Sequence, residues 1–136
     1  MDGRGVPVSL IVSGAETPDV SLLPETLQAR VLRRAPALAQ SPQYLGGDKG
    51  YTGKTAWEAS QEQGYTPALQ PRGNTTDRIP DPAARRRRWA VERCHRWLNQ
   101  FRKLTIRYEK LQRSYEGLLQ LACAMICWRQ TIPIYG

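Results

Sequence analysis

The chain has 136 residues, and 40% of them are hydrophobic, which suits one small domain with a single core. Lys and Arg number 20 against 12 Asp and Glu, so the net charge is +8 and a polyanion such as nucleic acid is the first partner to expect. No run approaches the roughly 18 apolar residues that span a bilayer, no basic leader precedes the first apolar stretch, and the three cysteines cannot all pair. We therefore expect a soluble cytoplasmic protein without a membrane partner.

The first predicted element is a strand. Residues 6–12 (VPVSLIV) alternate apolar side chains after the turn-like sequence DGRG at 2–5. A strand that leaves a hairpin turn needs a partner before the turn, so we expect the earlier strand of this unit upstream of residue 2.

Two helices and two further strands follow. Apolar residues spaced by four and three predict a helix over 19–34 and a second helix over 55–63, which Gly64 closes. Short strands are predicted at 43–47 and 65–69. The alternation of strands and helices predicts an α/β fold in which crossover helices cover parallel strands.

The C-terminal half is predicted to contain a loop and two long helices. Prolines and glycines indicate a surface loop at 71–82. A basic helix over 83–104 and a packing helix over 111–129 together form the region 83–130, and each has an apolar stripe at helical spacing. The residues predicted to face inward are Ala90, Cys94, Trp97, Phe101 and Leu104 on the first helix and Leu111, Tyr115, Leu118, Ala122 and Met125 on the second.

The positive charge is concentrated in one part of this half. Residues 72–113 contain 13 Lys or Arg and 4 Asp or Glu, whereas the remainder of the chain is close to neutral. Such a block is expected of a face that lies against phosphates, although a solvated, solubilising face has the same composition. Both interpretations stay open at this point.

A carboxylate follows the second predicted strand. Asp48 comes directly after QYLGG (43–47), and ligands of α/β sheets collect at the carboxyl ends of strands. Gly46, Gly47 and Gly50 let the backbone approach a ligand closely. A residue that caps the following turn would have the same pattern, so a purely structural role for Asp48 also stays open.

A second carboxylate lies in the basic helix. At about 100° per residue, Glu92 points away from the apolar stripe and shares a face with basic and polar residues. These residues are Arg85, Arg88, Arg96, Asn99 and Lys103. An intrahelical ion-pair lattice is the ordinary explanation, but a lattice has roughly equal numbers of both signs. Carboxylates from separate elements are ligands that Mg²⁺ prefers, and the surrounding cations would hold a phosphate.

The cysteines and tryptophans have a structural and a functional interpretation. Cys94, His95, Cys123 and Cys127 could supply four zinc ligands. We expect core cysteines instead, because Cys94 lies on the apolar stripe and a C-x3-C pair within one helix lacks the usual knuckle. The tryptophans are expected to be packing residues, with base stacking by Trp89 as the alternative.

Four blocks of the sequence stand out together. They are DGRGVPVSLIVSGAETPD (2–19), LGGDKGY (45–51), GYTPALQPR (64–72) and RRWAVERCHRWLNQFRKLTIRYEK (87–110). In this order, and over nearly the whole chain, they resemble the catalytic core of bacterial insertion-sequence transposases of the DDE type. The resemblance implies an incomplete RNase H-like core, in which a short sheet that lacks its first strands is followed by two long C-terminal helices.

The resemblance extends to individual residues. Asp48 matches the family's second catalytic aspartate, and Glu92 matches its catalytic glutamate. Arg88 stands four residues before Glu92, as in the family's signature Y-x2-R-x3-E-x6-K. The sequence departs from the signature at Arg85, which replaces the tyrosine, and at Asn99, which replaces the lysine.

The family's first aspartate lies on a strand upstream of the region that DGRGVP resembles, and Asp2, in the turn, does not take its role. The resemblance therefore implies that residues 1–136 are the C-terminal part of a catalytic domain, either a second reading-frame product or a remnant, and inactive alone. The implied reaction is DNA cleavage and strand transfer with two Mg²⁺ or Mn²⁺ ions, held in part by Asp48 and Glu92. The residues expected to contact DNA are Lys49, Tyr51, Arg88, Arg96, Lys103 and Arg107.

The implied partners are transposon ends and target DNA, an upstream segment that carries the first aspartate, and further copies of the chain on DNA. Two alternatives stay open. One is a basic DNA-binding module whose carboxylates only stabilise the fold, and the other is an inactive transposase remnant.

Overall fold

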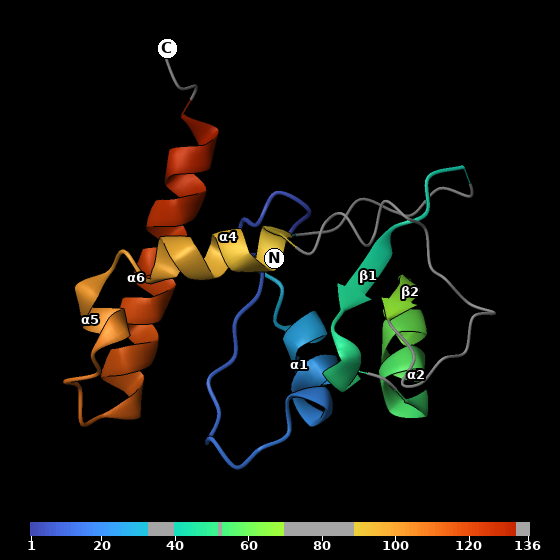
Figure 1. Ribbon diagram of the computed structural model, residues 1–136, viewed down its shortest axis with the longest axis horizontal. Helices are drawn as coiled ribbons and strands as arrows, with labels where there is room; N and C mark the ends of the chain where they lie inside the picture. Colours follow the sequence, from blue (N-terminus) through green and yellow to red (C-terminus); the bar gives the residue numbers. More distant parts are fainter. Residues whose placement is uncertain (33–39, 52, 70–88, 133–136) are drawn as a thin grey trace. The chain divides into compact units, whose positions relative to one another are not determined.

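The computed structural model describes residues 1–32, 40–51, 53–69 and 89–132 (Figure 1). The side chain of Lys49 is outside this description, as are the loop predicted at 71–82 and the first part of the predicted basic helix, residues 83–88. Among the described residues, no helix is both long enough and apolar enough to cross a membrane.

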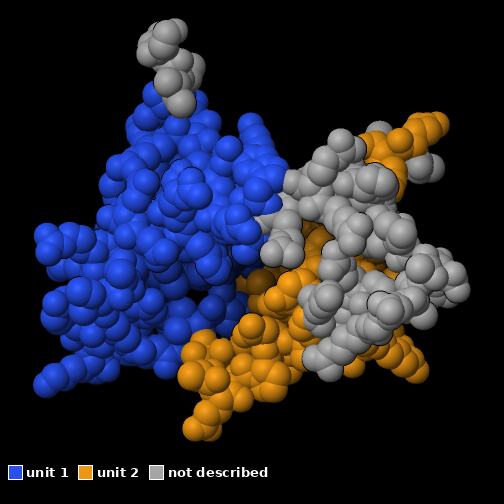
Figure 2. Space-filling view, viewed as in Figure 1, with its two compact units in different colours: residues 1–12, 89–136 blue, residues 13–88 orange. Residues whose placement is uncertain are grey.

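The chain divides into two compact units, which Figure 2 colours separately. Unit 1 is Met1–Val12 with Trp89–Gly136, and unit 2 is Ser13–Arg88. Each unit buries apolar side chains of its own. The buried apolar residues are Leu23, Leu27, Ala56, Ala59, Ala68 and Leu69 in unit 2 and Ala90, Cys94, Ala122 and Ile126 in unit 1.

The centre of unit 2 is a βαβ arrangement. Strand β1 (Tyr44–Gly47) runs parallel to strand β2 (Thr66–Leu69), and helix α2 (Lys54–Glu62) lies between them in the sequence. Parallel neighbours need such a crossover because the chain has to return to the same end of the sheet. The predicted α/β fold with parallel strands is confirmed here, while the RNase H-like arrangement stays a prediction. The paired residues are Tyr44 and Thr66, Leu45 and Pro67, Gly46 and Ala68, and Gly47 and Leu69.

Glycines set both ends of α2. Gly53 precedes the helix with a φ of 140°, and Gly64 follows it with a φ of 70°, values that residues with a Cβ rarely adopt. The N–H of Gly64 donates to the carbonyl of Gln61 (2.8 Å), which completes the last turn. The helix therefore ends where the sequence predicts.

The helix predicted over 19–34 is shorter than expected. It consists of the 3₁₀ turn η1 (Asp19–Leu22) and helix α1 (Leu23–Gln28). Val31, the next apolar position of the periodic pattern, is 86% exposed. The prediction is therefore confirmed for the first half of the range and wrong for the residues just after it.

Arg30 explains the early end of α1. Its Nε donates to the carbonyl of Leu27 (2.8 Å), so the side chain occupies a carbonyl of the last turn. Its Nη1 donates to the hydroxyl of Tyr65 (2.8 Å), and its guanidinium lies 5.4 Å from the centroid of the same ring. A contact across unit 2 thus stops a helix that local periodicity would continue.

The strand predicted at residues 6–12 does not form. These residues have no regular secondary structure and join no ladder with other described residues. An isolated strand has no partner for its backbone N–H and C=O groups, so apolar alternation alone does not make one. The turn before them is confirmed, because Asp2 Oδ1 accepts hydrogen bonds from the N–H groups of Arg4 and Val6 (both 2.9 Å).

The basic helix predicted to continue to Leu104 is interrupted. Helix α4 (Trp89–Leu98) stops, and a short helix α5 (Arg102–Thr105) follows after a turn. Phe101 has extended backbone angles, φ −88° and ψ 99°, and its N–H donates to the carbonyl of Leu98 (3.0 Å). The break therefore closes as a tight turn and redirects the Phe101 ring.

Helix α6 (Gln112–Thr131) confirms the second long helix, but its buried face differs from the predicted stripe. Ala122 and Ile126 are buried, whereas Leu111 is 70% exposed and Met125 is 41% exposed. Apolar residues occur around most of the circumference of α6, so periodicity does not select one face. The packing of α4 against α6 makes that selection.

Candidate active site

Asp48 lies directly after β1, at the carboxyl end of a parallel strand, as the sequence predicts. Its side chain is exposed. Oδ1 accepts a hydrogen bond from the N–H of Gly50 (2.8 Å), and the main-chain carbonyl accepts one from the N–H of Tyr51 (3.2 Å). Oδ2 accepts no hydrogen bond from the described residues. The turn thus orients the carboxylate while one oxygen stays available to a ligand.

Gly47 and Tyr51 surround the backbone that carries Asp48. A Cβ at Gly47 would lie 2.8 Å from Leu69 Cδ2 and 3.2 Å from Tyr51 Cβ, so a side chain fits at this position only if these neighbours shift. Burial of the Tyr51 ring, followed by the negative charges of Asp19 and Asp48, raises the pKa of the phenol. Burial and these two negative charges therefore all favour the protonated form of the phenol.

Glu92 lies in the first turn of α4 as described and is exposed. Arg96, one helical turn later, is also exposed, yet no ion pair joins it to Glu92. Arg88, one turn earlier, lies outside the described residues. Within the described part of α4, the ion-pair lattice that would explain Glu92 structurally is not formed.

Three of the residues expected to contact DNA are exposed in unit 1, namely Arg96, Lys103 and Arg107. Arg107 is held in place, because its guanidinium lies 5.0 Å from the ring centroid of Tyr115 and its Nε donates to the carbonyl of Glu109 (3.3 Å). No described carboxylate forms an ion pair with Arg96 or Lys103. Their charges are therefore available to a polyanion.

The other three expected DNA contacts are Lys49, Tyr51 and Arg88. Lys49 and Tyr51 belong to the 3₁₀ turn η2 (Lys49–Tyr51), directly after Asp48. The Tyr51 ring packs against the core of unit 2. The side chain of Lys49 and the whole of Arg88 lie outside the described residues, so their contacts with DNA stay predictions.

The two predicted catalytic carboxylates belong to different units, Asp48 to unit 2 and Glu92 to unit 1. Their shared metal site therefore stays a prediction. Within the described ranges, no group of three or more His, Cys, Asp or Glu side chains could hold a metal ion. Two acids are what the resemblance leads us to expect of this chain, because it places the third carboxylate upstream.

The cysteines all belong to unit 1, where Cys94 is buried and Cys123 and Cys127 are half-buried. Cys94 is buried on α4, as the apolar stripe predicts. Burial is the largest cause that raises the pKa of the Cys94 and Cys123 thiols; the positive N-terminus lowers both, and neighbouring thiols, including Cys127, raise both. Cys127 Sγ donates to the carbonyl of Pro7 (3.4 Å).

One feature of α4 was missed from the sequence. The guanidinium of Arg93 lies 4.1 Å from the ring centroid of Trp89 and 5.6 Å from that of Trp97. The spacing W-x3-R-x3-W is the available signal, because residues four apart are neighbours on a helix surface.

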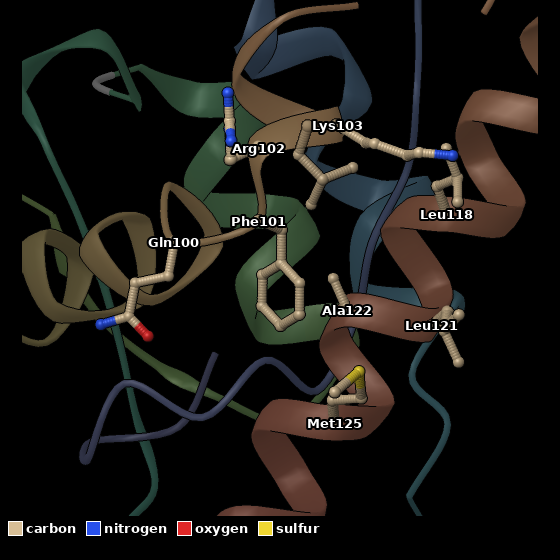
Figure 3. A pocket seen from close by; sticks show the side chains of 9 residues that line it. Gln100, Phe101, Arg102, Lys103, Leu118, Leu121, Ala122 and Met125 are labelled. Carbon is tan, nitrogen blue, oxygen red and sulfur yellow. The ribbon is translucent and has the colours of Figure 1, made fainter.

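An apolar groove with a volume of about 370 Å³ lies beside the break between α4 and α5 (Figure 3). Phe101 points toward Ala122 and Met125 of α6, and Lys103 extends along the rim toward Leu118. Neither predicted carboxylate lines this groove, so it is distinct from the candidate active site.

Comparisons with known proteins agree with the sequence resemblance. Residues 45–129 match the model of the family described as "Transposase DDE domain", and this range contains both Asp48 and Glu92. The chain is 33% identical over 131 residues to the transposase assigned to insertion sequence element IS402 of Burkholderia cepacia. The alignment covers 93% of this chain but 59% of that relative. No solved structure matches the chain significantly. The chain therefore belongs to the DDE transposases of insertion sequences, a family of DNA transposition.

Proposed function

We propose that this chain is the C-terminal part of a transposase catalytic core, in which Asp48 and Glu92 serve metal-dependent cleavage and strand transfer of transposon DNA. The observation that carries the proposal is the geometry of Asp48. Asp48 is an exposed carboxylate at the end of a parallel strand. The N–H of Gly50 fixes its Oδ1, whereas its Oδ2 accepts no hydrogen bond from the described residues. The turn uses only one oxygen, so the second oxygen of Asp48 can bind a cation without loss of the turn.

The donor chemistry fits a hard divalent cation. Mg²⁺ and Mn²⁺ take carboxylate oxygens and retain several waters, so exposed acids suit them better than buried thiols. Asp48 and Glu92 are exposed acids, and Glu92 forms no ion pair with any described residue. When bound, such ions activate the attacking oxygen and stabilise the leaving oxygen in phosphoryl transfer.

The residues of the chain itself bind and orient the substrate. The turn at Asp48 pre-orients one carboxylate, and α4 carries the other. Water first, and then a transposon 3′ hydroxyl, attacks a DNA phosphodiester in line. The residues that hold phosphates in this proposal are Lys49, Arg88, Arg96, Lys103 and Arg107, and Tyr51 is a further DNA contact.

The proposed active site is incomplete without a further segment. The chain spans 59% of the length of the relative that it matches. We propose that the first aspartate comes from a segment upstream of the region around DGRG, and that the partners are transposon ends, target DNA and further copies of the chain. The 136-residue chain alone is then expected to bind metal weakly and to cleave no DNA.

A manganese titration tests the roles of the two acids. We expect Asp48→Ala and Glu92→Ala each to abolish the Mn²⁺ binding of the parent chain, measured by electron paramagnetic resonance of free Mn²⁺. Glu62→Ala is the matched control, because Glu62 is an exposed acid on α2 that has no role in the proposed site. This variant should bind Mn²⁺ as the parent chain does.

Equal Mn²⁺ binding by the parent and both site variants would contradict the proposal and leave a basic DNA-binding module. Cleavage is assayed with the upstream segment supplied, because the chain alone lacks the first aspartate in this proposal. We expect strand cleavage that needs Mg²⁺ or Mn²⁺ and that disappears in either site variant.

A further inference from the structure

The N-terminal segment Asp2–Pro7, which we call the strap, has a defined conformation in unit 1. Asp2 Oδ1 accepts hydrogen bonds from the N–H groups of Arg4 and Val6 (both 2.9 Å), and Asp2 N–H donates to Val6 O (2.8 Å). The N–H of Gly5 donates to the carbonyl of Asp2 (3.0 Å). These bonds close a tight turn, so the strap is an ordered element although it is not a strand.

Gly5 is the point at which the strap packs on α4. It is buried, its φ is 87°, and a Cβ there would lie 2.7 Å from the carbonyl oxygen of Ala90 and 3.3 Å from Arg93 Cβ. Both the backbone conformation and the space therefore require glycine. Ala90 belongs to the same helical turn as Glu92.

Arg93 completes the contact from the side of the helix. Its Nη1 donates to the carbonyl of Arg4 (3.5 Å), and its guanidinium lies over the Trp89 ring at 4.1 Å and the Trp97 ring at 5.6 Å. Two aromatic faces and a strap carbonyl thus hold one cation. This arrangement restrains the long side chain on which Gly5 packs.

The other end of the strap contacts α6. Cys127 Sγ donates to the carbonyl of Pro7 (3.4 Å). The strap therefore touches both long helices of unit 1, α4 through Gly5 and α6 through Pro7.

We propose that the strap fixes the first described turn of α4 and thereby positions Glu92, which makes Gly5 and Arg93 positioning residues for the proposed metal site. This inference rests on the proposed function. Glu92 is next to Arg93 in the sequence, about 100° around the helix, so a rotation of this turn moves the carboxylate directly.

Metal affinity of the full 136-residue chain, measured with Mn²⁺ alone, tests this role. We expect Gly5→Ala to weaken Mn²⁺ binding roughly tenfold, the size typical of residues that orient a metal ligand. Gly14→Ala is the matched control, because Gly14 has no positive φ and a Cβ there meets nothing within 4 Å. Hydrogen exchange of the α4 amides in the metal-free chain is the second readout and should accelerate in Gly5→Ala only.

A second pair of variants covers the case in which Gly5→Ala does not fold, as judged by circular dichroism. Arg93→Met removes the cation between the indoles and should weaken Mn²⁺ binding, whereas Arg93→Lys retains a cation there and should restore most of the affinity. Both variants leave Glu92 in place.

The outcomes separate the two proposals. The decisive variant is Gly5→Ala if it folds, and Arg93→Met if it does not. If this variant binds Mn²⁺ as the parent does while Glu92→Ala loses binding, the strap is only structural and the inference is wrong. Faster exchange of α4 amides without a change in Mn²⁺ affinity would also contradict the inference. If the parent and Glu92→Ala bind Mn²⁺ equally, the proposed function fails, and the inference fails with it.

Discussion

At the scale of single residues, the two glycines before Asp48 differ sharply in the space around them. Gly47→Ala places a methyl group 2.8 Å from a side chain that is 4% exposed, Leu69, so the neighbours have little room to yield. We expect the free energy of unfolding to fall by about 1–3 kcal/mol, the usual effect of overpacking. Urea denaturation of the chain measures this change.

Gly46→Ala is the matched control for that experiment, because a Cβ at Gly46 meets nothing within 4 Å. It should leave stability unchanged or raise it by about 0.5–1 kcal/mol, since alanine loses less entropy than glycine in a strand. If Gly47→Ala is as stable as Gly46→Ala, Leu69 and Tyr51 do not enclose this backbone tightly.

The positions of the two acids could be predicted from local patterns, whereas their surroundings could not. The pattern that predicts Asp48 is local, because a strand that ends in two glycines comes directly before it. Its hydrogen bond from the N–H of Gly50 is also local, because it joins residues only two apart. The negative charges of Asp19 and Asp48 both act on Tyr51, because η1 packs against η2. No residue spacing in the sequence predicts this packing. Neighbouring residues in the sequence thus determine the turn at Asp48, whereas tertiary packing determines which side chains surround that turn.

At the scale of elements, the α4–α6 contact should make the chain sensitive to alkali. Burial raises the pKa of the Cys94 thiol above its ordinary value of 9.0, so the folded state favours the protonated form. This stabilisation is fully present below the pKa of the unfolded chain and is lost as the pH rises through the higher folded pKa.

Unfolding free energies measured by urea at neutral and alkaline pH test this linkage. We expect the free energy of unfolding of the parent chain to fall as the pH rises above about 9. The fall should be smaller in Cys94→Ala and smaller again when Cys123→Ala is added, because burial also raises the Cys123 pKa. A remaining fall at higher pH is expected from Tyr51. Identical pH profiles for the parent and the double variant would contradict the role of the buried thiols.

The elements that the sequence predicted correctly are those whose signals are local. The segment 43–69 forms β1, α2 and β2 because glycines end the helix and the strands pair with each other. The predicted strand at 6–12 fails because a strand also needs a partner, and the described residues supply none. The break after Leu98 was missed because apolar spacing continues through it to Leu104, while the backbone of Phe101 leaves the helix.

At the scale of the whole molecule, the basic block identified in the sequence divides between described and undescribed residues. Arg96 and Lys103 are exposed in unit 1 and form no ion pair with a described carboxylate. Lys54, by contrast, pairs with Glu58 on α2 (3.6 Å) in unit 2. A cationic side chain without an ion-pair partner in the protein can neutralise a DNA phosphate, and this releases a counterion that was bound to the DNA.

The salt dependence of DNA binding therefore separates these cations. We expect the affinity of the chain for a double-stranded oligonucleotide of arbitrary sequence, measured by fluorescence anisotropy, to fall steeply with salt. Arg96→Gln and Lys103→Gln should each reduce the slope of log K against log salt by about 1, since each removes one phosphate contact. Lys54→Gln is the matched control and should leave the slope unchanged. A Lys54→Gln slope that falls as much as the other two would mean that net charge, and not a defined face of unit 1, binds the DNA.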